Sequence, residues 1–169
     1  ISSPSVSLAK EFSKKHRVFF IEHPHTWWDV VRGRRNALKE TKPFPGVTII
    51  KPPVVLPVNF LPQGRLYNFF SGINGNILLS VLRHTIEKYN IRKYIFINFF
   101  DPFFFNDIPA DIKPGRYVYQ CMDDMSQVEY TNRHGVRLEN EIVSKADLVL
   151  CTSRRLTELK SHFTNKAFF

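Results

Sequence analysis

The chain has 169 residues, of which 43% are hydrophobic and 23% are charged. This composition is typical of a globular domain that can bury a core, and the 16 phenylalanines argue against intrinsic disorder. The longest apolar runs are far shorter than the ~18 residues that a membrane-spanning helix needs. The formal net charge of +9 favours contact with phosphates, nucleic acid or an anionic membrane face, without choosing among them.

The amino-terminal residues predict a helix followed directly by a strand. Ser3 can cap a helix that Pro4 opens at its first position, and residues 17–22 form the strand. An alternating sheet begins with a strand, so we expect the first strand to be missing from this sequence. The absence of an initiator Met and of a signal-peptide pattern indicates that the residues ahead of Ile1 were removed or are not ordered.

The middle of the chain alternates between connections, strand and helix. A long polar and aromatic connection is predicted at 23–46, and two prolines reduce the run at 47–56 to a short or edge strand. From Gly75 the apolar spacing becomes helical, and Asn90 is a natural stop. The next predicted elements are a strand at 91–100, a loop or short helical turn at 103–114 and a strand at 116–122.

The last third of the chain has the clearest pattern. Helical apolar spacing ends at Ala146, and the unbroken run 148–151 indicates a strand buried on both faces, as in a parallel sheet between helix layers. Another helix follows, and 166–169 is typical of the start of one more strand. We therefore expect a single α/β domain over 1–169, a Rossmann-like parallel sheet with helices on both faces.

Several short motifs follow one another in a fixed order along the chain. A helix carrying Leu-Glu is followed by Ala-Asp, a hydrophobic strand, Thr-Ser and Leu; these are Leu138-Glu139, Ala146-Asp147, 148–151, Thr152-Ser153 and Leu156. Residues 8–24 contain a predicted helix and the strand that follows it. Residues 117–124 contain a predicted strand that ends in acidic residues. Together these motifs resemble the N-terminal half of GT-B-fold glycosyltransferases allied to glycosyltransferase family 4.

The resemblance implies a function. It implies retaining transfer of a sugar from a nucleotide-sugar donor to a glycan or lipid-linked acceptor, with no cofactor and no obligatory metal. This chain would be the acceptor-side domain, and the donor would be held mainly by a second, C-terminal domain that is absent here. The fragment alone is then expected to be inactive.

Two adjacent carboxylates close the strand at 116–122. Asp123 or Asp124 could take a proton from an acceptor hydroxyl, and we predict them as the catalytic residues. The alternative is a helix cap or turn, where Asp is common. We favour function because ligands of parallel sheets bind at the carboxyl ends of strands and the resemblance agrees. Neighbouring side chains on a strand point to opposite faces, so no metal is expected there.

A second group of candidates could face the donor phosphate or the interdomain cleft. Thr152, Ser153 and Arg154 begin a helix, whose amides and arginine could face an anion. The alternative is that Ser153 only caps the helix and Arg154 lies at the surface. By the resemblance, Ser2 and Ser3 occupy the loop after the first strand, near the donor diphosphate, although the Gly-Gly expected there is lacking.

The acceptor-binding candidates end two other strands. Glu22 and His23 follow the strand at 17–22, and Asn98 and Asp101 lie at the end of the strand at 91–100. A histidine in a polar loop more often neither binds metal nor moves protons.

Cysteine usage and charge bear on location and partners. Cys121 and Cys151 are predicted to be buried at strand ends and free, which favours a reduced, cytoplasmic protein, and neither has a zinc-type partner. The basic run Arg32 to Arg35 with its neighbouring tryptophans could rest peripherally on the inner membrane face. No specific nucleic-acid partner is expected. The other hypotheses are a GT-B-like sugar-nucleotide epimerase and a non-catalytic basic domain that binds phosphate or nucleic acid.

Overall fold

The computed structural model describes residues 4–33, 45–127, 131 and 133–169. The chain forms two compact units, Ile1–Pro57 and Val58–Phe169. The first unit contains α1 (Pro4–Ser13), β1 (Val18–Ile21), α2 (Trp27–Val31) and β2 (Val47–Ile50). The second contains α3 (Arg65–Lys88), β3 (Ile95–Phe99), η2 (Ala110–Ile112), β4 (Arg116–Cys121), η3 (Met125–Gln127), α4 (Gly135–Lys145), β5 (Leu148–Cys151), α5 (Arg154–Ser161) and β6 (Ala167–Phe168).

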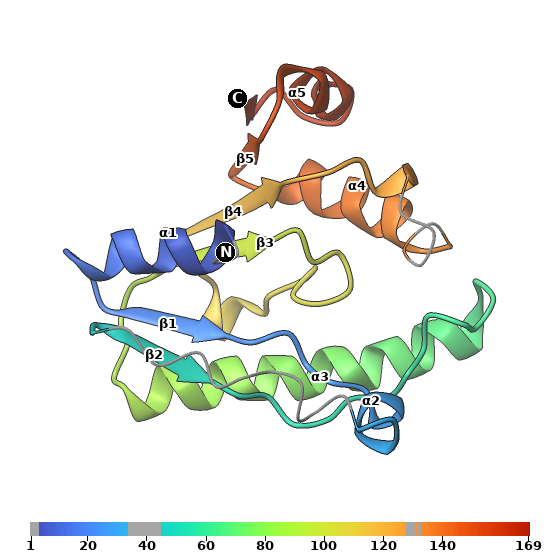
Figure 1. Cartoon of the computed structure of the whole chain (residues 1–169), viewed down its shortest axis with the longest axis horizontal. Helices are drawn as coiled ribbons and strands as arrows, with labels where there is room; N and C mark the ends of the chain where they lie inside the picture. The colour runs from blue at the N-terminus through green and yellow to red at the C-terminus, as the bar shows by residue number, and fades with distance from the viewer. Residues whose placement is uncertain (1–3, 34–44, 128–130, 132) are drawn as a thin grey trace. The chain divides into compact units, whose positions relative to one another are not determined.

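In the first unit, β1 and β2 form a two-stranded parallel sheet. Val18 lies opposite Val47 and Ile21 opposite Ile50, and α1 packs beside both strands (Figure 1). The predicted helix start at Pro4 and the two predicted strands are confirmed.

The prediction of a continuous connection from 23 to 46 is wrong in its first part, because α2 forms there. A capping box starts this helix: Asp29 N–H donates to Thr26 Oγ1 at 3.4 Å, and Thr26 N–H donates to Asp29 Oδ2 at 3.0 Å. Trp27 and Trp28 lie in its first turn, with ring centroids 4.2 Å apart and both rings exposed. The Thr-x-x-Asp spacing was present in the sequence and identifies the helix start.

In the second unit, β3, β4, β5 and β6 form a four-stranded sheet in that order, and every neighbouring pair is parallel. Asp147 sets the start of β5 against β4, because its Oδ2 accepts from Tyr117 N–H at 2.8 Å and its N–H donates to Tyr117 O at 2.9 Å. Parallel sheets flanked by helices make this a Rossmann-like α/β fold, as the alternation predicts (Figure 1). The short strand predicted at 166–169 is confirmed as β6.

Helix α3 begins ten residues earlier than predicted, at Arg65 instead of Gly75. One buried stripe runs along its whole length: Tyr67, Asn74, Leu78, Leu82 and Thr85. Two glycines inside the helix weaken its sequence pattern, but the buried stripe continues past them. The predicted stop is confirmed, since Asn90 follows the helix with a left-handed φ of 48°.

A hydrophobic core cluster of the second unit lies where α4 and α5 cover β4 and β5. It is formed by Tyr119, Cys121, Ile142, Val143, Ala146, Val149, Cys151 and Leu156. The apolar run 148–151 forms a strand of this core, as its pattern predicts, but it is not fully buried on both faces: Val149 and Cys151 are buried, whereas Leu148 and Leu150 are half-buried. Both cysteines are buried and free. Across the described ranges, no helix combines the length and apolarity that crossing a membrane requires.

Candidate functional site

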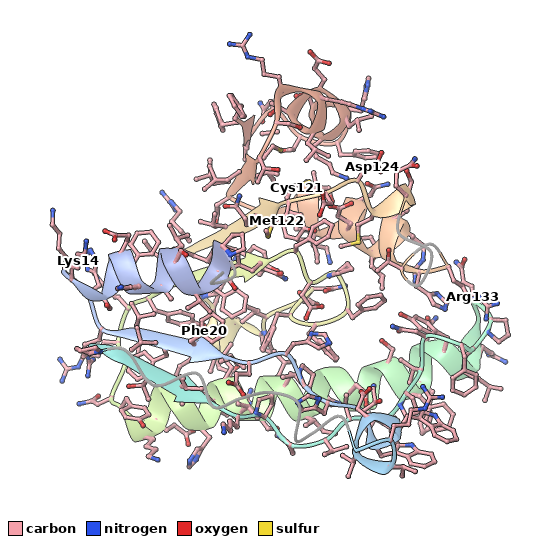
Figure 2. The ribbon with its side chains drawn as sticks, viewed as in Figure 1. Lys14, Phe20, Cys121, Met122, Asp124 and Arg133 are labelled. Atoms are coloured by element: carbon pink, nitrogen blue, oxygen red, sulfur yellow. The ribbon has the colours of Figure 1, made fainter. Side chains whose placement is uncertain are left out.

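The carboxyl ends of β3, β4 and β5 lie along one edge of the four-stranded sheet. Because the strands are parallel, with Phe99 opposite Gln120 and Cys121 opposite Cys151, the three turns that follow them are neighbours. Most of the predicted site residues of the second unit lie in these turns. In Figure 2, Cys121, Met122 and Asp124 mark the end of β4 and the turn after it. We call this the carboxyl edge.

After β3, the predicted acceptor-binding residues hold the backbone of their own turn. The buried Asn98 donates from Nδ2 to Asp101 O at 2.9 Å and to Tyr117 Oη at 3.0 Å, and it accepts from Asp101 N–H at 3.0 Å. Asp101 Oδ1 accepts from Phe103 N–H at 2.9 Å. The hydrogen-bonding groups of Asn98 are therefore committed to the turn and to Tyr117 of β4, whereas Asp101 is half-buried at the rim of the turn.

After β4, the two aspartates differ. Asp124 Oδ1 accepts from Ser126 Oγ at 2.7 Å and from Ser126 N–H at 3.0 Å, so Asp124 starts η3 as a turn-forming residue. The side-chain hydrogen bond from Ser126 holds the pKa of the Asp124 carboxyl below its usual value, helped by the charges of Lys160 and Arg155. Asp123 is exposed, and its carboxylate makes no hydrogen bond or ion pair within the described ranges. Asp123 is thus the carboxylate available to a ligand.

After β5, Thr152 and Ser153 fix the start of α5. Thr152 donates from N–H to Cys121 O at 3.1 Å and from Oγ1 to Met122 O at 2.8 Å, which joins the ends of β4 and β5. Ser153 Oγ accepts from Leu156 N–H at 3.2 Å, and this confirms the predicted N-cap. Arg154 is exposed beside them.

A buried charged pair beneath the carboxyl edge was missed in the sequence. Glu139 on α4 and Lys160 on α5 have side chains only 1% and 8% exposed, and Lys160 Nζ donates to Glu139 Oε2 at 2.6 Å. Tyr119 Oη and Cys121 Sγ, both from β4, donate to Glu139 Oε1 at 3.0 and 3.6 Å. Glu139 shares helical spacing with Ile142, so an inward position could have been predicted.

The environment of this pair keeps its neighbours neutral. Burial, and then the charge of Glu139, raise the pKa of the Tyr119 hydroxyl and of the Cys121 thiol far above their ordinary values. A thiol with a raised pKa is a poor nucleophile, so Cys121 packs as a small hydrophobe. The network therefore supports the strand end from below and has no reactive group of its own.

The remaining predicted site residues belong to the first unit. Glu22 follows β1 directly and donates from N–H to Ile50 O at 3.0 Å, and His23 is the next residue. Ser2 and Ser3 lie outside the described residues, so their predicted place near a diphosphate stays a prediction. Within the ranges that the structure describes, no three His, Cys, Asp or Glu side chains gather as a metal site.

Comparison with known proteins found no match among family models, curated proteins or solved structures.

Proposed function

We propose that this chain is the acceptor-side domain of a glycosyltransferase that moves a sugar from a nucleotide-sugar donor to a hydroxyl of a glycan or lipid-linked acceptor. The observation that carries the proposal is the exposed Asp123, whose carboxylate has no hydrogen-bond or ion-pair partner among the described residues, at the carboxyl edge where open parallel sheets bind ligands. The motif order from Leu138 to Leu156, which resembles family 4 enzymes, supports the same function.

In this proposal, Asp123 orients the acceptor hydroxyl or takes its proton. A carboxylate at hydrogen-bond distance from the hydroxyl can do so as the nucleophilic oxygen develops. Asp124 shapes the turn that presents Asp123, because its own Oδ1 is occupied by Ser126. Arg154 is an exposed cation on the next turn, where it can attract a phosphate of the donor.

A second candidate, a basic domain that binds phosphate or nucleic acid without catalysis, is favoured by the net charge of +9. Binding of this kind is driven by counterion release and falls steeply with salt. Selective nucleic-acid binding that survives physiological salt would favour this candidate over the transferase.

The test uses the full-length natural protein that carries this sequence. It is incubated with UDP-, GDP- and ADP-sugars in the presence and absence of a mixed glycan and lipid-linked acceptor extract, and products are separated by mass spectrometry. Transfer that requires the acceptor supports the proposal. Donor epimerisation without acceptor identifies the sugar-nucleotide epimerase alternative, and the absence of any donor turnover contradicts both enzymes.

A further inference from the structure

Helix α3 carries apolar side chains on two different sides. One side is the buried stripe described above, and the other consists of Leu66, Phe69 and Ile73, which are exposed. At about 100° per residue these three lie within a sector of about 60°, so they form one face. Leu66 is 66% and Phe69 is 64% exposed, which is unusual for large apolar side chains placed together. We call this face the α3 patch.

The segment before α3 adds a further exposed ring at this end of the helix. Phe60 is 63% exposed, and its carbonyl accepts a hydrogen bond from Arg133 Nη1. The next carbonyl, that of Leu61, lies 2.9 Å from His134 Nε2, and the His134 ring stacks on Tyr67 at 3.7 Å. These contacts hold residues 60–61 beside the first turns of α3.

The charged residues of the patch and of the segment before it are basic, and Glu141 of α4, whose charge acts on Tyr67 in the buried stripe, is paired with Arg137. Between Glu40 and Glu87 the sequence contains no Asp or Glu. Arg65 adjoins Leu66 in the first turn of α3, and Arg133 is exposed where it meets Phe60. A surface that is apolar at its centre and basic at its rim is complementary to an anionic one.

Farther along α3 the same face becomes polar. Ser80 and His84 continue the line of Leu66 and Ile73, and both are exposed. The apolar character is therefore confined to the first half of the helix, as expected for a local contact and not for a helix that is buried all round.

We infer that the α3 patch docks on an anionic lipid bilayer, with Leu66, Phe69 and Ile73 in the interface and Arg65 and Arg133 against the headgroups. An interfacial helix of this kind inserts its apolar side chains at the boundary between headgroups and acyl chains, and basic residues attract it to anionic lipid. The inference concerns a surface other than the carboxyl edge, and it requires no donor or acceptor.

The test is co-sedimentation of the full-length protein with phosphatidylcholine vesicles that contain or lack phosphatidylglycerol. We expect binding to the anionic vesicles, weakened by salt. The variant Leu66→Gln/Phe69→Gln should bind about tenfold or more weakly, because it removes the inserted groups. Arg65→Gln should weaken binding to the anionic vesicles about fivefold and should leave binding to the neutral vesicles unchanged.

The matched control is Ile95→Gln/Phe168→Gln, which changes the same number of exposed apolar side chains on β3 and β6. It should bind as the unchanged protein does, and circular dichroism checks that all variants fold.

Binding by Leu66→Gln/Phe69→Gln that equals binding by the unchanged protein would overturn the inference. The inference would also be overturned if the protein did not bind vesicles but formed a concentration-dependent dimer, measured by light scattering, that Leu66→Gln/Phe69→Gln abolishes. In that case a second copy of the chain would cover the patch. Vesicle binding is measured without sugar turnover. A failure to bind vesicles therefore leaves the transferase proposal intact, and a failure to transfer sugar leaves the membrane-docking inference intact.

Discussion

The carboxyl edge and the interior beneath it are both charged, but burial gives their charges opposite roles. Asp123 lies in water without a partner in the described part of the chain, so it costs the fold little. Glu139 is 1% exposed and holds Lys160 at 2.6 Å, because a buried charge is tolerated only when it is paired. The comparison indicates that function is to be sought in the exposed carboxylate and stability in the buried pair. Glu139→Gln and Asp123→Asn test that division, and Ser153→Ala and Asp124→Asn test the turns beside it.

The largest effect is expected for Glu139→Gln, which keeps the size of the side chain and removes its charge. The ammonium of Lys160 would then be buried without a counter-charge, and the free energy of unfolding should fall by about 3–5 kcal/mol. Urea denaturation at neutral pH measures it. A change below about 1 kcal/mol would mean that water reaches Lys160 and that the pair is not a buried one.

Two controls sharpen this measurement. Glu141→Gln lies on the same helix and removes an exposed pair with Arg137 at 2.5 Å, so it should cost less than about 1 kcal/mol. The double variant Glu139→Gln/Lys160→Met removes both buried charges and keeps an amide oxygen that can accept from Tyr119 Oη, so it should recover most of the stability lost in Glu139→Gln.

The next effect is expected for Asp123→Asn in the full-length protein. If Asp123 contacts the acceptor, turnover should fall by ~10²-fold or more, because the amide cannot accept the proton. The free energy of unfolding should change by less than about 1 kcal/mol, since the side chain is exposed. Glu87→Gln, an exposed carboxylate on α3, is the activity control. Near-normal transfer by Asp123→Asn would show that Asp123 is a turn residue.

Local patterns predicted the elements of this fold better than its long-range contacts. The strand 148–151 and the Ser153 cap follow from a few adjacent residues, and both are confirmed. The start of α3 was predicted too late because Gly72 and Gly75 interrupt the apolar spacing, whereas packing of Tyr67 extends the helix past them.

The site was predictable only in part, for the same reason. The positions of Asp123 and Asp124 at the end of a strand follow from the hydrophobic run before them, and the turn that Asp124 forms with Ser126 is local. The partner of Glu139 is 21 residues away, and Lys160 reads as an ordinary surface lysine in the last turn of a helix. Only the crossover from α4 through β5 to α5 brings the two together.

A smaller effect is expected for Ser153→Ala. Loss of the hydrogen bond from Leu156 N–H leaves a first-turn amide of α5 without its cap, which should cost about 1 kcal/mol. Urea denaturation measures the change. Ser161→Ala, whose hydroxyl donates to Thr157 O on the exposed side of the same helix, should change stability by less than about 0.5 kcal/mol. Equal effects of the two substitutions would contradict the capping role.

The smallest effect is expected for Asp124→Asn, and it should depend on pH. The hydrogen bonds from Ser126 lower the folded-state pKa of Asp124 below its ordinary value of 3.8. A lowered pKa contributes stability that is fully present above the ordinary value and is lost as the pH falls through the folded-state pKa. Asp124→Asn should therefore cost about 0.5 kcal/mol at most at neutral pH, because the carboxylate is largely hydrated, and nothing in stronger acid. Paired urea titrations of Asp124→Asn and the unchanged protein across this pH range measure the difference in the free energy of unfolding. A cost for Asp124→Asn that persists in strong acid would mean that the shape of the turn, and not the charge of Asp124, is what Ser126 stabilises.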